Sequence, residues 1–422
     1  MNLAHLGLLA TLLATSATGQ DPADQDQAAG ADRHRVSGVE IAAVVEGQNQ
    51  FALDLYARLH ERPGNLCFSP LSLAAALTMA HAGAHGETAE QIARVLHLPA
   101  DGGSAGRASG ALLRGLSGDA GPRGVQLTWA NSLWAAKQLG LLPEFASLLQ
   151  ERYASAPSVV DFQGDPESAR RAINGWIGAH TDGKVPEFFQ PGVIDGHTQL
   201  VLANALTFRG RWAAAFQKER TQPGAFRLSP GRQVQVPFMQ QTGKFRRAAT
   251  DFGEILELPY SGHDVAFLLL LPRQADRLAE LEKRLTASSL AEWTRRLKPE
   301  SLVLSLPRFA IDRELHLEDD LSELGMPRAF RPDAADFSGL CSAGQPVALS
   351  EVAQRVRIQV DETGTEAQAA TAVRSARGLG DSTVRELKAD HPFVFLLRDL
   401  RTGSILFLGR LSDPAPRARD DR

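Results

Sequence analysis

Length, composition and charge exclude several classes of protein. The chain has 422 residues, 43% hydrophobic and 22% charged, which supports a large core and excludes a disordered or fibrous chain. Its 45 Lys and Arg residues nearly balance 49 Asp and Glu residues, and the net charge of -4 supplies no field to attract nucleic acid or an anionic membrane. We therefore expect no nucleic-acid and no membrane partner.

The first residues predict an exported protein. Residues 6–13 form a short apolar run followed by small residues up to Gly19, the pattern of a secretory signal, although the start lacks the usual Lys or Arg. The run is too short to span a bilayer. We expect a signal peptide at 1–19, a disordered segment at 20–37, one domain at 38–414 that no repeat or linker divides, and a polar tail at 415–422. A secreted or extracytoplasmic location follows.

Helical patterns dominate the first half of the chain and strand patterns the second. Apolar spacing predicts helices at 71–82, 87–96 and 166–180, and the glycine-rich stretch 101–124 predicts a mobile loop around a short helix. Short apolar or alternating runs predict strands at 200–208, 255–259, 265–271, 302–306, 355–360 and 393–397. This order favours an α+β domain.

Motifs for catalysis, metals and cofactors are missing. The sequence has no nucleophile elbow, no His-Glu-x-x-His, no Cys-x-x-Cys and no phosphate-binding loop. His81 and His85 lie four apart in a region of helical pattern, but no third ligand is evident. Cys67 and Cys341 are too few for a disulfide framework, and we expect two buried thiols, with a single bridge as the alternative. We expect no enzyme, metal or cofactor.

The segment 361–392 has an unusual alternation. From Thr365 to Ser375, every second residue is small or β-branched, whereas the intervening positions include Glu366, Gln368 and Arg374. One face of such a strand could enter a sheet interior without a clash. The alternative is an ordinary surface helix and loop.

A series of motifs, in order along residues 40–414, resembles the serpin family. They are NLCFSPLS (65–72), GAHGET (83–88), ANSLW (130–134), VDF (160–162), INGW (173–176), TDGK (181–184), NALTFRGRW (204–212), LPY (258–260), LGM (324–326), ADFSG (335–339) and HPF (391–393). The stretch DETGTEAQAATA (361–372) resembles the hinge of inhibitory serpins. Each motif is weak alone, but the ordered series is specific.

The resemblance implies a metastable serine protease inhibitor. Its fold would have three β-sheets, about eight or nine helices and an exposed reactive-centre loop. A target serine protease, or alternatively a cysteine protease, would cleave the loop and stay attached as an acyl-enzyme while the hinge inserts into the central sheet. A monomer is expected, and a non-inhibitory carrier, chaperone or storage serpin is the alternative. Only Arg107, Arg114 and Arg123 lie near the glycine-rich segment, so no glycosaminoglycan site is expected.

The resemblance also assigns residues to the mechanism. The hinge comprises Glu362, Gly364, Thr365, Glu366, Ala367, Ala369, Ala370 and Thr371, and the region where the sheet opens includes Ser69, Ser72, Asn204 and Gln354. Gln354 departs from the family, which often has histidine there. Family spacing counts to Gly378 and Leu379 as the cleaved bond, whereas a loop one residue shorter gives Arg377 and Gly378. We choose Arg377, whose charge suits the acidic pocket of a trypsin-like protease, with Arg374 or Leu379 as further alternatives.

Overall fold

The computed structural model describes most of the chain. The described residues are 36–100, 102–116, 124–153, 155–181, 183, 187–342, 346–365 and 385–415. Within them the helices are α2 (Gly38–Leu59), α3 (Pro70–His81), α4 (Gly86–Val95), α5 (Gly102–Leu116), α6 (Pro143–Tyr153), α7 (Pro166–His180), α8 (Leu278–Arg284), α9 (Ala287–Arg295) and α10 (Glu318–Leu324). The helices expected at 71–82, 87–96 and 166–180 are confirmed as α3, α4 and α7. None of the described helices is long and apolar enough to cross a membrane.

Helix α5 corrects the expected loop around a short helix. It runs for 15 residues and buries Ala105, Ala108 and Leu112 despite its glycines. Glycine weakens an isolated helix, but a Cβ on Gly110 would lie 1.9 Å from the carbonyl oxygen of Arg152 at the end of α6. Gly110 therefore allows α5 to pack closely against α6, which the local pattern does not reveal.

The expected pairing of His81 and His85 on one helix is wrong. Helix α3 ends at His81, and His85 precedes α4, where its backbone N–H donates to the carbonyl of Asp336. A turn through Gly83 separates the two histidines. The two cysteines, Cys67 and Cys341, are buried thiols that form no disulfide, as expected.

The described strands form two hydrogen-bonded networks. They are β1 (Leu66–Phe68), β2 (Val125–Ala136), β3 (Ser158–Val160), β4 (Leu200–Arg211), β5 (Gln222–Ser229), β6 (Arg232–Ala249), β7 (Gly253–Pro259), β8 (Val265–Pro272), β9 (Lys298–Pro307), β10 (Phe309–His316), β11 (Leu349–Val360), β12 (Gly364–Thr365), β13 (Arg385–Lys388), β14 (Phe393–Asp399) and β15 (Ile405–Leu411). Six strands form the central sheet in the order β10-β11-β12-β4-β2-β3. All six strands expected from the sequence are present.

The larger network has nine strands and is joined through β6. The first part of β6 pairs with β5, its middle with β9 and its last residues with β7. Strand β6 thus belongs both to a sheet with β5, β9 and β13 and to a sheet with β7, β8, β14, β15 and β1. Counted in this way, the described strands form the three sheets expected, and the α+β class is confirmed.

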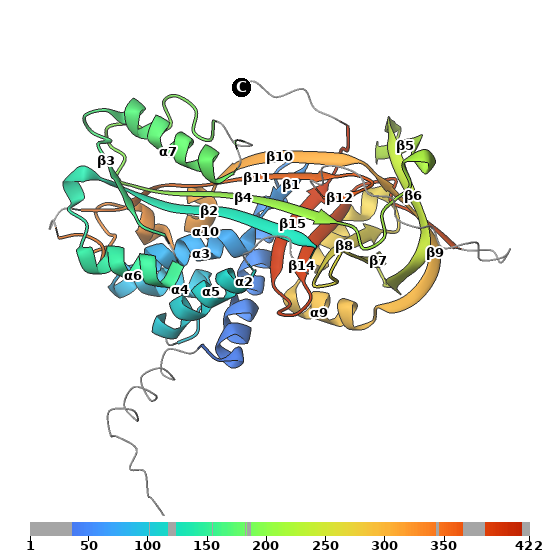
Figure 1. Ribbon diagram of the computed structural model, residues 1–422, viewed down its shortest axis with the longest axis horizontal. Coiled ribbons are helices and arrows are strands. Elements are labelled where there is room, and N and C mark those ends of the chain that lie inside the picture. Colours follow the sequence, from blue (N-terminus) through green and yellow to red (C-terminus); the bar gives the residue numbers. More distant parts are fainter. Residues whose placement is uncertain are drawn as a thin grey trace, which may run out of the picture.

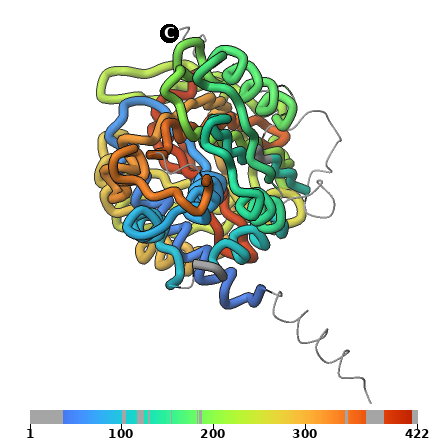
Figure 2. Tube along the Cα trace, turned by 90° about the vertical axis from the view of Figure 1, so that its left-hand side faces the viewer, coloured from blue at the N-terminus to red at the C-terminus, as the bar shows by residue number. Residues whose placement is uncertain are grey.

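The central sheet is covered on both faces. Figure 1 shows α7 above strands β2 and β4, and α3 below them, where α3 also contacts β15. Every residue of α3 from Pro70 to Ala80 is buried, which fits a helix that is apolar on all sides. Seen from the end of the molecule in Figure 2, α7 (green) and α2 (deep blue) lie on opposite sides. The buried helix α3 places its N-terminus directly beneath the central sheet.

Candidate functional site

Strands β11 and β4 meet in a parallel pairing, called here the seam, that runs from Leu349 beside Leu200 to Arg357 beside Thr207. At one end of the seam, the two residues of β12 lie between the two strands. Thr365 pairs antiparallel with Val360 of β11 and with Gly210 of β4. The described end of the hinge is therefore already a short strand of the central sheet.

The backbone at the start of β12 requires glycine. Gly364 has a φ of +157°, and a Cβ there would lie 1.9 Å from the carbonyl oxygen of Gly210. Just before it, the Asp361 carboxylate accepts hydrogen bonds from the N–H groups of Thr363 (2.8 Å) and Gly364 (3.2 Å). This tight turn sends the chain from the end of β11 back into the seam.

The side chain of Thr365 points into an aromatic cluster. Its hydroxyl lies 2.6 Å from the hydroxyl of Tyr260, and Thr365 is fully buried. Tyr260 stacks on Trp212 at 4.6 Å and meets Phe208 edge-on at 4.9 Å. Burial raises the pKa of Tyr260, so its hydroxyl stays neutral. A small polar side chain fits this position, and a long or charged one would be buried without a partner.

Glu362 fastens the turn to the body of the protein. It is 2% exposed, and its carboxylate accepts hydrogen bonds from Nε of Arg308 at 2.7 Å and from the hydroxyl of Thr221. Burial alone would raise the pKa of Glu362, but the hydrogen bonds from Arg308 and Thr221 outweigh it and lower the pKa. We call Glu362, Arg308 and Thr221 the hinge latch.

A second contact crosses the middle of the seam. Asn131, Asn204 and Gln354 occupy one level of the neighbouring strands β2, β4 and β11, because Asn204 is in register with both of the others. The start of α3 supplies Ser69 and Ser72 beneath them. These five residues form what we call the buried polar network.

Hydrogen bonds connect the network across the seam. Gln354 accepts from the N–H of Ser69 at 2.7 Å, and its amide donates to the Ser69 carbonyl at 3.0 Å and to Oδ1 of Asn204. The Asn204 amide donates to Ser72 and Asn131. Ser69 also caps α3, so the helix end and the seam share one residue. Ser69, Gln354 and Asn204 are at most 1% exposed, so water cannot replace these bonds.

Comparison with known proteins identifies the family. Residues 46–414 match the family model described as Serpin (serine protease inhibitor), which covers most of the chain. The chain belongs to the serpin family. It is 36% identical over 373 residues to an uncharacterized serpin-like protein of Thermococcus kodakarensis, covering 88% of this chain and 86% of the relative.

A curated relative and a solved structure show the extent of the similarity. This serpin is 36% identical to the human leukocyte elastase inhibitor over 384 residues, 86% of this chain and 98% of the relative. The crystal structure of human thyroxine-binding globulin superimposes with a TM-score of 0.82 at 27% identity, covering 89% of this serpin and all of the neighbour. The fold expected from the motifs is thereby confirmed.

The structure brings together the sheet-opening residues predicted for this serpin. Ser69, Ser72, Asn204 and Gln354 are in mutual contact, and Asn131, which the prediction missed, completes them. Its position in the motif ANSLW, on a strand next to Asn204, was the available signal. Arg308 was also missed, because nothing in its local sequence connects it with Glu362.

Gln354 satisfies its site without the histidine common in the family. The one oxygen and two N–H groups of the amide make three hydrogen bonds here, whereas a neutral imidazole has one donor and one acceptor. The network of this serpin therefore holds the seam with a group that does not titrate. The expectation that glutamine can replace histidine as donor and acceptor agrees with this geometry.

The remaining predicted residues lie outside the described part of the chain. Of the hinge, Glu362, Gly364 and Thr365 are described, and Glu366, Ala367, Ala369, Ala370 and Thr371 are not. The predicted cleaved bond, Arg377 to Gly378, is also outside it. These assignments stay predictions, as do the boundaries of the signal peptide, domain and tail.

Proposed function

We propose that this serpin inhibits a trypsin-like serine protease as a suicide substrate. The observation that carries the proposal is the position of Gly364 and Thr365 between β11 and β4. A strand that continues from them enters the seam with its register already set. The similarity to an inhibitor of leukocyte elastase supports the same class of activity.

The register connects insertion with the buried polar network. Thr365 faces Gly210 on one side and Val360 on the other, and both pairings are antiparallel. Continued without a bulge for six residues, this register puts Thr371 opposite both Asn204 and Gln354. Insertion then breaks the hydrogen bond between these two amides and offers the Thr371 hydroxyl in exchange. The small residues at alternate hinge positions keep the barrier to this exchange low.

The chemical step needs only the protease and the loop. The protease serine attacks the Arg377 carbonyl carbon, the bond to the Gly378 nitrogen breaks, and the nitrogen leaves as a free amine after taking a proton. Arg377 remains attached to the protease as an ester. Insertion of the hinge carries the protease away from its loop-binding position before water attacks the ester.

Trypsin provides the direct test of inhibition and of the bond. Wild-type protein should form a complex with trypsin that survives denaturing electrophoresis, and mass spectrometry should find a released peptide that begins at Gly378. The variant Arg377→Ala should lose the complex, whereas the control Arg374→Ala should keep it. A peptide that begins at Leu379 would move the bond by one residue, and rapid cleavage without a complex would reject inhibition.

A substitution at a hinge position that has yet to insert separates cleavage from trapping. Ala367→Arg, predicted to face inward, should still be cleaved but should trap less than about a tenth as much protease, because its guanidinium would be buried without a partner on insertion. Gln368→Arg, predicted to face outward, is the matched control and should trap like wild type. Equal trapping by Ala367→Arg would contradict insertion.

A non-inhibitory binding role is the alternative, supported by the likeness to thyroxine-binding globulin. The two roles differ in what cleavage of the loop does. An inhibitor should gain a large increase in Tm when the loop is nicked, because the hinge becomes a new central strand. An unchanged Tm together with no trypsin complex would favour the binding role.

We also propose that the protein is exported. The support is the apolar run 6–13 followed by small residues in the sequence. Export predicts a mature protein that begins within or after residues 14–20 and occurs outside the cytoplasm. N-terminal sequencing of the fractionated protein tests this, and an intact Met1 in all fractions would reject it.

A further inference from the structure

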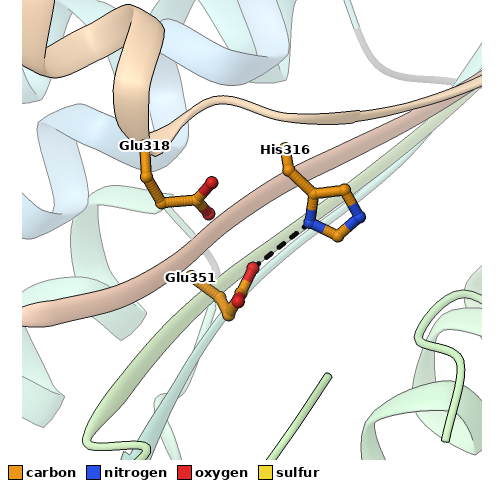
Figure 3. A group of neighbouring side chains, drawn as sticks. All are labelled: His316, Glu318 and Glu351. Atoms are coloured by element: carbon orange, nitrogen blue, oxygen red, sulfur yellow. Dashed lines mark hydrogen bonds and ion pairs between the residues drawn. The ribbon is translucent and has the colours of Figure 1, made fainter. Parts of the chain in front are cut away.

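Three side chains meet near the start of β11, at the end of the seam where Leu349 pairs with Leu200. His316 ends β10, Glu318 begins α10 and Glu351 lies near the start of β11. One ligand-type atom from each lies within 4.8 Å of the others. Figure 3 shows the two carboxylates and the imidazole turned toward a common space.

The neighbours of these side chains hold them in a ligand-like orientation. Nδ1 of His316 lies 3.3 Å from the Glu351 carboxylate, and its other ring nitrogen, Nε2, lies 3.1 Å from the carboxylate of Glu314. A carboxylate on the far ring nitrogen is the usual support of a metal-binding histidine. One oxygen of Glu318 accepts the N–H of Val352 at 2.5 Å, and its carboxyl group also lies within hydrogen-bond range of Glu351, so a cation here would separate two acidic groups that are now in contact.

We propose that Nδ1 of His316 and one carboxylate oxygen each of Glu318 and Glu351 bind Zn²⁺. One imidazole with two carboxylates suits zinc, whereas Mg²⁺ and Ca²⁺ prefer oxygen ligands alone. A solvent molecule takes the fourth position of the tetrahedron. The proposal is independent of the proposed inhibitory function, because none of these residues belongs to the hinge latch or the buried polar network. Glu351 is in a seam strand, where it pairs with Val201, but the proposed ligand is its side chain.

The ion can reach this position from solvent. The His316 side chain is 42% exposed, and a pocket of about 460 Å³ opens beside Glu318. His197 also lines this pocket. The pocket therefore offers the ion an entry path. It also contains a second histidine, so the experiment must distinguish binding by His316 from binding by His197.

Zinc at this site connects three elements on one side of the seam. The pairing of β10 with β11 ends at His316 beside Ala353, so residues 349–352 extend beyond it. They are held instead by β4 and by contacts to the start of α10. A bound ion fastens this end of β11 to β10 and α10 and makes no bond to β4. We expect zinc to raise the Tm of the uncleaved protein.

Calorimetric titration of the full-length protein tests the site. The protein is freed of metal with a chelator, dialysed and titrated with ZnCl₂ at pH 8. This pH favours the neutral imidazole and ionised carboxylates that zinc binding requires. We expect one zinc per chain and no binding of Mg²⁺.

Matched variants locate the ion. His316→Ala and Glu351→Gln should each weaken zinc binding by at least about tenfold, whereas Glu144→Gln, an exposed change on α6, should leave it unchanged. X-ray absorption of the zinc complex should show nitrogen and oxygen at about 2.0–2.2 Å and no sulfur. Circular dichroism verifies that each variant is folded.

Several results would overturn the assignment. These are no zinc binding by folded wild-type protein, a sulfur ligand, or equal binding by wild type and His316→Ala. Loss of binding in His197→Ala but not in His316→Ala would place the ion in the neighbouring pocket and reject the proposed ligands.

Discussion

The hinge latch and the buried polar network both hold the seam in its uncleaved arrangement, but by different interactions. The latch is ionic and borders solvent, since Glu362 is buried but the side chain of its partner Arg308 is 42% exposed. The network consists of neutral amides and hydroxyls that are buried in the core, except for the half-buried Asn131. Water can replace the latch contacts as they open, whereas the network can only exchange one internal hydrogen bond for another.

This difference indicates a division of roles. A contact near solvent can release the turn after β11 at a modest cost and so governs when the hinge moves. A fully buried contact costs more to break without a substitute, and it governs whether the seam opens before a new strand arrives. The position of Thr371 in the continued register supplies that substitute.

The largest expected effect comes from the network. Gln354→Ala should reduce the free energy of unfolding by about 3 kcal/mol. The substitution leaves the backbone N–H of Ser69 and the side-chain oxygen Oδ1 of Asn204 buried without the partner that Gln354 provides. Urea denaturation of the uncleaved protein measures this. Gln359→Ala is the matched control, an exposed glutamine on the same strand, and should change the value by less than about 0.5 kcal/mol. Equal losses would contradict the central role of the network.

A smaller effect is expected at the latch. Arg308→Ala should lower the free energy of unfolding by about 2 kcal/mol, since Glu362 keeps its burial but loses its charged partner. It should also speed polymer formation on mild heating, seen by native electrophoresis. Arg357→Ala, an exposed arginine on β11, is the control. If Arg308→Ala lowered the free energy of unfolding by more than Gln354→Ala does, the hinge latch would contribute more stability than the buried polar network, contrary to the proposal.

The smallest effect is a pH dependence confined to the latch. The pKa of Glu362 is lowered from its ordinary 4.5, so its stabilising contribution is complete above that pH and is lost as the pH falls through the lowered pKa. The free energy of unfolding of the wild type should exceed that of Glu362→Gln by about 1 kcal/mol at pH 7, and this difference should shrink below pH 4. Thermal melting of the wild type and of Glu362→Gln at several pH values between 3 and 7 measures the difference and its pH dependence. A constant difference would show that the charge of Glu362 is unimportant.

The sequence predicted most elements whose signals are local. Apolar spacing at 71–82 indicated α3, and the short apolar run at 265–271 indicated β8. Helix α5 is longer than the short helix predicted, because Gly110 is explained only by its contact with the backbone of α6, which is distant in the chain. The same reason applies to Arg308, whose role depends on a contact with a residue 54 positions away.

What the sequence determined alone was the family and the alternation of small residues in the hinge, because ordered motifs and side-chain parity are properties of the chain itself. Only the tertiary structure decided that Asn131, Asn204 and Gln354 share one level of three strands, since strand register is set by pairing. It likewise decided that Gly364 passes against the carbonyl of Gly210. Contacts of this kind join residues that no local pattern connects, so they become visible only when the sheet is assembled.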